Sequence, residues 1–118
     1  MKKALVIDDD PSDLRRMKRI LEKNGFRVAT AINAEEASKI IKKKHFDTVI
    51  VDIMLPGSPG YHIIRQLREK FNQKTKILIV SITPESHVDI SLADAFIQKP
   101  FSPESFMAKV ITGQEKGA

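Results

Sequence analysis

The chain has 118 residues, a length that fits one compact domain and leaves little room for a second. Hydrophobic residues make up 42% and charged residues 30%, which excludes wholesale disorder, and the lack of cysteine excludes disulfides and thiolate chemistry. The net charge is +5, but no aromatic residues interleave with the basic clusters, so a solvated helix face is favoured and nucleic acid is an unlikely partner.

Three continuous apolar runs predict strands that are buried on both faces. They span residues 4–7, 48–51 and 77–80, and each is followed directly by a polar residue. Such runs are typical of a parallel sheet that is covered by helices. Residues 26–31 and 95–98 predict two shorter strands nearer the sheet edges.

Helical patterns fill the gaps between these strands. The first begins behind Pro11, a favourable first-turn residue, and Gly25 is its expected stop. The second opens at Asn33 with Glu36 three residues later, which resembles a capping box.

Three further helices are expected along the rest of the chain, around residues 61–67, after residue 84 and from residue 102. The one after residue 84 must be short. Alternating strands and helices predict a single α/β domain of three layers over residues 1–118, with residues 112–118 as a frayed tail or the remnant of a longer chain. No apolar run approaches the roughly 20 residues of a membrane span and no signal peptide is evident, so we expect a cytoplasmic protein with no membrane partner.

Polar residues collect at the carboxyl ends of the predicted strands, which share one edge of an open parallel sheet. They are Asp8, Asp9, Asp10, Asp52, Ser81 and Lys99. Crowded carboxylates repel one another, and Mg²⁺ relieves this repulsion. With the lysine ammonium and the serine hydroxyl, these groups suit phosphoryl transfer, in which an aspartate can be the nucleophile.

Each of these residues has a simpler explanation when taken alone. Asp10 precedes Pro11 and is expected to cap a helix. Ser81 alone would be a strand-end hydroxyl, and Lys99 alone a surface lysine. The prediction of a site therefore depends on their shared edge of the sheet.

With these residues in place, the chain resembles the receiver domains of bacterial two-component response regulators over essentially its whole length. The matching segments are 4–11 (ALVIDDDP), 51–57 (VDIMLPG), 79–81 (IVS) and 99–101 (KPF). The resemblance implies a flavodoxin-like (βα)5 sandwich whose five-stranded parallel sheet has the order 2-1-3-4-5.

The resemblance also implies a role for each residue of the acidic cluster. Asp52 is the expected phosphoacceptor. Asp8 and Asp9 form the acidic pair that binds Mg²⁺, with Asp9 the more direct ligand and Asp8 acting through water. The main-chain carbonyl of Met54 is a further expected ligand of Mg²⁺. The implied protein is not an enzyme with a separate substrate, since it catalyses its own phosphorylation and dephosphorylation.

Three more residues match the family pattern on the last two strands. Ser81 and Lys99 are expected to hold the phosphoryl oxygens. Phe96 matches an aromatic position whose rotation reports phosphorylation, although a core aromatic is the alternative. The bond between Lys99 and Pro100 is expected to be cis.

The chain departs from the family pattern around the expected pocket. Ile82 stands where Ala or Gly is usual, so its side chain could restrict the access of water or a phosphodonor. Pro59 replaces an acidic residue, and Leu92 replaces a glycine. The stretch between Ser81 and Lys99 is short by about four residues, about one helical turn, which predicts a shortened fourth helix and a changed output face.

The expected partner is a histidine kinase or a histidine phosphotransfer protein, which would dock beside the first helix with Arg15, Arg16 and Arg19 outward. The output protein or domain is unknown, and a weak homodimer stays open. Two alternatives from other classes also stay open. One is a receiver-fold binding module that is not phosphorylated, and the other is a Mg²⁺-dependent phosphohydrolase of the haloacid dehalogenase type with Asp8 as nucleophile.

Overall fold

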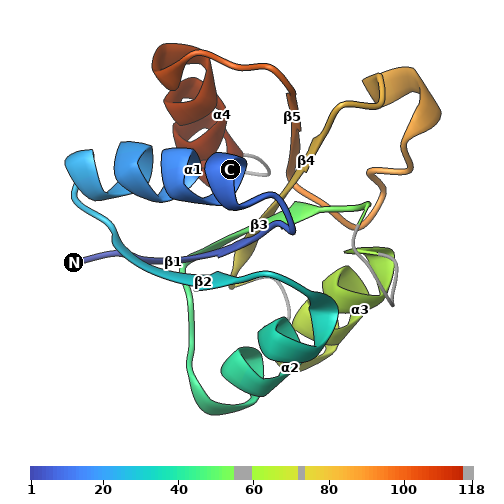
Figure 1. Cartoon of the computed structure of the whole chain (residues 1–118). Helices are drawn as coiled ribbons and strands as arrows, with labels where there is room; N and C mark the ends of the chain where they lie inside the picture. Colours follow the sequence, from blue (N-terminus) through green and yellow to red (C-terminus); the bar gives the residue numbers. More distant parts are fainter. Residues whose placement is uncertain (55–59, 72–73, 116–118) are drawn as a thin grey trace.

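The computed structural model describes residues 1–54, 60–71 and 74–115, which form one parallel sheet between two layers of helices (Figure 1). The five strands have the order β2-β1-β3-β4-β5, as the resemblance implied. Their bounds are Lys3–Ile7 (β1), Arg27–Ala31 (β2), Thr48–Asp52 (β3), Lys76–Ser81 (β4) and Ala95–Gln98 (β5). The α-helices are Pro11–Lys23 (α1), Ala34–Lys43 (α2), Gly60–Phe71 (α3) and Pro103–Glu115 (α4).

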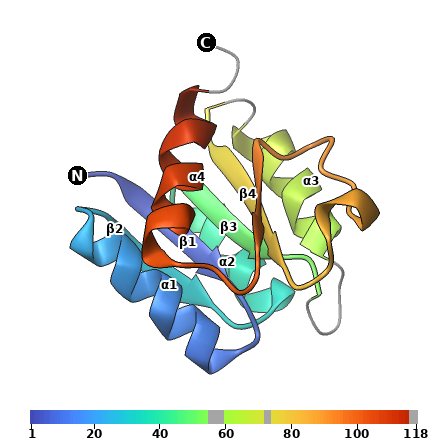
Figure 2. The same ribbon diagram turned by 90° about the horizontal axis from the view of Figure 1, so that it is seen from above.

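The sheet is buried on both faces because its apolar side chains alternate between two hydrophobic clusters. In β1, Ala4 and Val6 pack with residues of α1 and α4, whereas Leu5 and Ile7 pack with residues of α2 and α3. Figure 2 shows the same division from above, with α1 and α4 on one side of the sheet and α2 and α3 on the other. The continuous apolar runs of the sequence follow from this double coverage.

The ends of the first two helices follow the predicted capping chemistry. The carboxylate of Asp10 accepts hydrogen bonds from the backbone N–H groups of Ser12 and Asp13, so Asp10 is the N-cap of α1. Gly25 follows α1 with a φ of +89°, a conformation that favours glycine.

The start of α2 carries a variant of the predicted capping box. The side chain of Asn33 accepts from the N–H of Glu36 at 2.8 Å. The carboxylate of Glu36 accepts from Ile32, one residue before the cap, at 3.0 Å.

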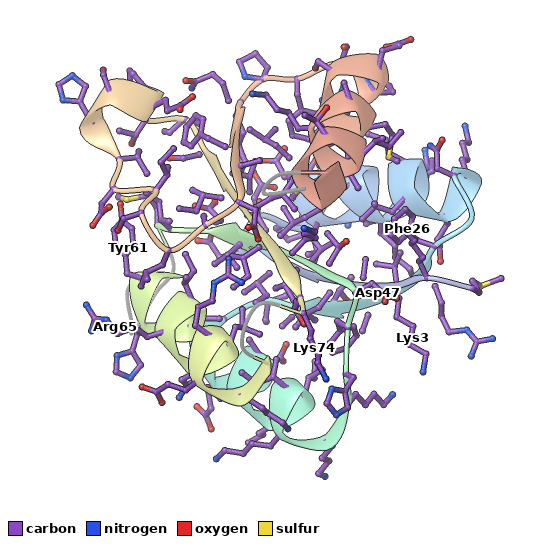
Figure 3. The ribbon with its side chains drawn as sticks, turned by 180° about the vertical axis from the view of Figure 1, so that it is seen from behind. Lys3, Phe26, Asp47, Tyr61, Arg65 and Lys74 are labelled. Carbon is purple, nitrogen blue, oxygen red and sulfur yellow. The ribbon has the colours of Figure 1, made fainter. Side chains whose placement is uncertain are left out.

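The connection between β4 and β5 contains only a 3₁₀ helix, Glu85–His87, where the sequence predicted a short fourth helix. The partly buried side chains of Val88 and Ile90 pack on the core in its place. Tyr61, near the start of α3, accepts a hydrogen bond from the N–H of Asp89 at 2.8 Å. Figure 3 shows Tyr61 at the end of α3 that lies nearest this connection.

A second anchor holds the end of this connection on α3. The guanidinium of Arg68 donates to the carbonyl of Leu92 at 2.8 Å, to the carbonyl of Thr75 at 3.0 Å and to the carboxylate of Asp94 at 2.9 Å. The connection is therefore tied to α3 by polar contacts, although it lacks the short α-helix that the sequence predicted.

The last helix extends beyond the predicted element. α4 continues to Glu115, so residues 112–115 are helical, whereas the sequence suggested a frayed tail from residue 112. The buried side chains of Phe106 and Val110 anchor this helix, and the hydroxyl of Thr112 donates to the carbonyl of Ala108. No helix among the described residues is long and apolar enough to cross a membrane.

Candidate functional site

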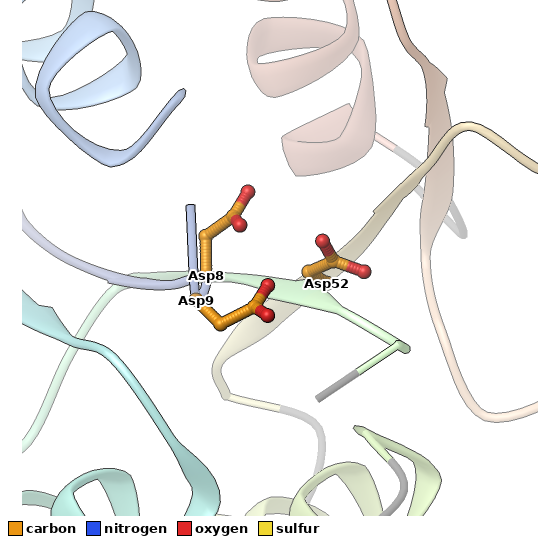
Figure 4. A group of neighbouring side chains, drawn as sticks. All are labelled: Asp8, Asp9 and Asp52. Carbon is orange, nitrogen blue, oxygen red and sulfur yellow. The ribbon is translucent and has the colours of Figure 1, made fainter. Parts of the chain in front are cut away.

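Three carboxylates meet at the carboxyl ends of β1 and β3 (Figure 4). Asp8 and Asp9 follow β1, and Asp52 is the last residue of β3. One oxygen of each carboxylate lies within 4.8 Å of the others. Asp8 is fully buried, Asp52 is 6% exposed and Asp9 is exposed. The structure thus brings together three of the four acidic residues that the strand ends predicted, whereas Asp10 caps α1.

Lys99, directly after β5, reaches across the sheet edge into this cluster. Its ammonium lies 2.8 Å from the carboxylate of Asp8, 2.8 Å from that of Asp13 and 3.2 Å from that of Asp52. The lysine side chain is 9% exposed. Its backbone N–H donates to the carbonyl of Ser81, and the following bond to Pro100 is cis, as expected. An ammonium has three donors, and here each meets a carboxylate.

The buried charges alter the acidity of two of these groups. Burial raises the pKa of Asp8, against the opposing effects of the Lys99 hydrogen bond and of the Asp10 backbone N–H. Burial would lower the pKa of Lys99, but its hydrogen bonds to Asp13 and Asp8 outweigh burial and raise that pKa above its ordinary value. Lys99 therefore stays charged at neutral pH and holds a crowded set of carboxylates together.

Asp13 is a site residue that the sequence reasoning missed. It lies in the first turn of α1, three residues after the N-cap Asp10, and so close to the end of β1. An acidic residue in a first helical turn is ordinarily explained by the helix dipole, which concealed its contact with Lys99. Its position next to the strand end was the signal that could have revealed it.

The end of β4 supplies a buried hydroxyl. Ser81 is fully buried, and its Oγ accepts from the N–H of Thr83 at 3.0 Å, which leaves its hydrogen for another acceptor. The next residue, Ile82, is 74% exposed, and its carbonyl accepts from the side chain of Gln98 at 2.9 Å. The effect of Ile82 on access to the pocket stays a prediction.

The backbone after Asp52 is packed closely against the start of α3. The N–H of Met54 donates to Asp52 at 2.8 Å and fixes one carboxylate oxygen. A Cβ on Gly60 would lie 2.5 Å from the Cα of Ile53, so a glycine is required where α3 begins. Pro59, whose replacement of an acidic residue was noted in the sequence, lies outside the described residues.

Phe96, the predicted switch residue, is a core residue in this structure. Its side chain is 4% exposed and packs in the cluster between the sheet and α2 and α3. The alternative of a core aromatic therefore describes its present position. Its rotation upon phosphorylation stays a prediction.

The donor set of this edge fits a hard divalent cation. Carboxylate oxygens from Asp8, Asp9 and Asp52 are the ligands that Mg²⁺ accepts, and the exposed Asp9 leaves room for water. A cation would also relieve the repulsion that contributes to the raised pKa of Asp8. A nucleophilic carboxylate beside a cation site, an ammonium and a hydroxyl can accept a phosphoryl group.

Comparison with known proteins assigns this arrangement to a family. Residues 4–111 match the family model described as response regulator receiver domain. The alkaline phosphatase synthesis transcriptional regulatory protein PhoP of Bacillus subtilis is 35% identical over 115 residues, which cover 92% of this chain and 47% of PhoP. The chain thus spans about half the length of the curated relatives it matches.

Solved structures agree with the family match. The response regulator TrrA of Thermotoga maritima, crystallised with Mg²⁺ and BeF, has 31% identity and a TM-score of 0.86, with 96% of this chain and 99% of TrrA covered. A second structure shows TrrA in complex with the histidine kinase ThkA. Its TrrA chain has 31% identity and a TM-score of 0.84, and the match covers 96% of this chain and 98% of that chain. The sheet order, the acidic cluster and these matches together show that the chain belongs to the response regulator receiver domain family.

Proposed function

We propose that this receiver domain accepts a phosphoryl group on Asp52, with Mg²⁺ held by Asp8, Asp9 and Asp52 and by the carbonyl of Met54. The main support for the proposal is the pair of contacts that the Asp52 carboxylate makes at the sheet edge. One oxygen accepts from the N–H of Met54 and the other lies 3.2 Å from the ammonium of Lys99. This carboxylate is therefore held in one orientation beside a buried positive charge.

The proposed reaction moves the phosphoryl group from a phosphohistidine of the donor protein to Asp52. An oxygen of Asp52 attacks the phosphorus, the new O–P bond forms, and the P–N bond to the histidine breaks. Bound Mg²⁺ would supply charge neutralisation at the phosphoryl oxygens. Lys99 contributes its fixed positive charge to the same oxygens, and Ser81 offers its hydroxyl hydrogen.

The phosphorylated state would be transmitted through the packed core. We infer that Ser81 moves toward the phosphoryl group and that Phe96 repacks in response, which shifts a two-state equilibrium. The same domain would later release the phosphate by hydrolysis of the acyl phosphate. The output protein or domain stays unassigned.

Replacing Asp52 with Asn tests this proposal. Incubation of the wild-type protein with Mg²⁺ and phosphoramidate is expected to add one phosphoryl group, seen as a shift in intact mass. Asp52→Asn should lose the shift because an amide is not a nucleophile here. Undiminished labelling of Asp52→Asn would contradict the assignment of the nucleophile, and no labelling of the wild type would favour the binding module that is not phosphorylated.

A basic groove beside α1 supports a protein phosphodonor with an acidic surface. The groove has a volume of about 450 Å³ and lies between α1 and the start of α4. Its lining includes Arg15, Arg16, Arg19 and Lys23. Arg16 donates to the carbonyl of Phe101 and stacks on its ring, whereas Arg15 and Arg19 are exposed and form no ion pair with any described residue. Such unpaired charges favour an acidic partner.

Reversing this charge should slow phosphoryl transfer from a protein donor but not from a small phosphodonor. The double variant Arg15→Glu/Arg19→Glu is expected to receive phosphoryl from a phosphorylated histidine phosphotransfer protein about tenfold more slowly at low salt. Its labelling by phosphoramidate should not change, because Asp52 is untouched. Lys43→Glu/Lys44→Glu, at the end of α2, makes the same change of charge elsewhere and serves as the control. Equal slowing by both double variants would reject a docking role for the groove.

A further inference from the structure

The three hydrogen bonds of Lys99 leave no ammonium donor for a phosphoryl group. Asp8, Asp13 and Asp52 each accept one of them, at 2.8, 2.8 and 3.2 Å. We propose that Asp13 holds Lys99 in the unphosphorylated state and that a phosphoryl group on Asp52 must displace Asp13 from the ammonium. This inference rests on the proposed function, because it concerns how Lys99 reaches the phosphoryl group.

Burial decides which of the three carboxylates gives way. Asp8 is fully buried, so water cannot replace Lys99 as the partner of the Asp8 oxygen that accepts from it. Asp52 carries the phosphoryl group and must stay. The side chain of Asp13 is 32% exposed, and water can replace the lysine as its partner at a much smaller cost. Asp13 is therefore the partner that Lys99 exchanges.

The negative charge of Asp13 opposes the binding of an anion at Asp52. If Asp13 kept its bond to Lys99, its carboxylate and a phosphoryl oxygen on the same ammonium would lie within about 6 Å of each other, twice a hydrogen-bond length. Two negative groups at that distance repel. Asp13 thus weakens the binding of an anion at Asp52 and strengthens the binding of a cation beside it.

The opposite signs of these two effects separate a positioning role from a merely structural one. A variant that only loosened the fold would weaken the binding of both ions. Asp13→Asn, which removes the charge and preserves the shape, should bind beryllofluoride at saturating Mg²⁺ about three- to tenfold more tightly. The same variant should bind Mg²⁺ alone more weakly.

The test is a titration of the wild-type protein, Asp13→Asn and Asp13→Glu with beryllofluoride, followed by NMR of the backbone amides. Asp13→Glu keeps the charge and can still reach Lys99, so its affinity should stay close to that of the wild type. Glu22→Gln, on the last turn of the same helix, makes the same change of charge without a described contact to Lys99 and should not alter either affinity. Equal affinities of Asp13→Asn and the wild type would overturn the proposal.

The ammonium signal of Lys99 gives a second readout that does not depend on affinity. Without ligand, the ¹⁵N and ¹H shifts of this ammonium should differ between the wild type and Asp13→Asn. With beryllofluoride bound, the two proteins should give nearly the same shifts, because Asp13 has left Lys99. An equal difference in both states would contradict the exchange.

Asp13→Ser replaces Asp13→Asn in both experiments if Asp13→Asn fails to fold, since serine is tolerated in a first helical turn.

The behaviour of the wild-type protein separates the proposed function from this inference. A wild-type protein that bound no beryllofluoride with Mg²⁺ would overturn the proposed function itself, and this inference with it. Wild-type binding with an unchanged Asp13→Asn would overturn the inference alone.

Discussion

Replacing Lys99 with methionine should destabilise the fold at neutral pH by about 3 kcal/mol, and Mg²⁺ should restore part of that loss. The ammonium of Lys99 forms ion pairs with Asp8, Asp13 and Asp52. Without it, the fully buried carboxylate of Asp8 would have no cationic partner among the residues that the structure describes. A bound Mg²⁺ would replace part of the missing charge and stabilise the folded state by mass action.

Urea denaturation with and without Mg²⁺ measures this effect. Lys109→Met is the matched control, because Lys109 is an exposed residue of α4 and its loss should change the free energy of unfolding by less than about 0.5 kcal/mol. If Lys99→Met were as stable as the wild type without Mg²⁺, the lysine would not be the charge that holds the cluster together.

Asp8→Asn should have the opposite effect and raise the free energy of unfolding by about 1 kcal/mol. Burial raises the pKa of Asp8, so the folded protein holds its charged form less readily than the unfolded chain does. An asparagine oxygen can still accept from the N–H of Asp10, and Lys99 keeps Asp13 and Asp52. Removing the charge relieves the repulsion, and this gain is expected to exceed the cost of the one Lys99 hydrogen bond that is lost.

The same variant should lose most of the stabilisation that Mg²⁺ gives the wild type, because one carboxylate of the cation site is gone. Thermal unfolding with increasing Mg²⁺ measures both effects in one series. Asp9→Asn provides the comparison, since Asp9 is exposed and its loss should weaken the Mg²⁺ effect with little change in stability. A less stable Asp8→Asn with an intact Mg²⁺ effect would contradict this account of the acidic cluster.

The sequence could predict the fold and the acidic edge because both depend on local patterns. Continuous apolar runs reveal strands that are covered on both faces, and a parallel sheet places the ends of those strands together. Asp8, Asp52 and Lys99 follow from that topology without any knowledge of side-chain positions. The cap at Asp10 was predictable for a similar reason, since Pro11 marks the first helical turn.

The contacts that could not be predicted depend on the reach of side chains between elements. Asp13 meets Lys99 across 86 residues of sequence, and nothing in the local pattern of α1 distinguishes it from an ordinary first-turn acid. The anchors of the β4–β5 connection are of the same kind. The short spacing predicted a reduced helix, but only the three-dimensional structure shows Tyr61 and Arg68 of α3 holding the chain that replaces it.

Asp52 is the expected phosphoacceptor, and finding the residue that carries the phosphoryl group decides this assignment. The protein would be incubated with acetyl phosphate and Mg²⁺ and then reduced with borohydride, which converts an aspartyl-phosphate to homoserine that peptide mass spectrometry can place. Homoserine is expected at position 52, and none is expected when EDTA removes the Mg²⁺. Homoserine at position 8, or no conversion at position 52 with Mg²⁺ present, would contradict it.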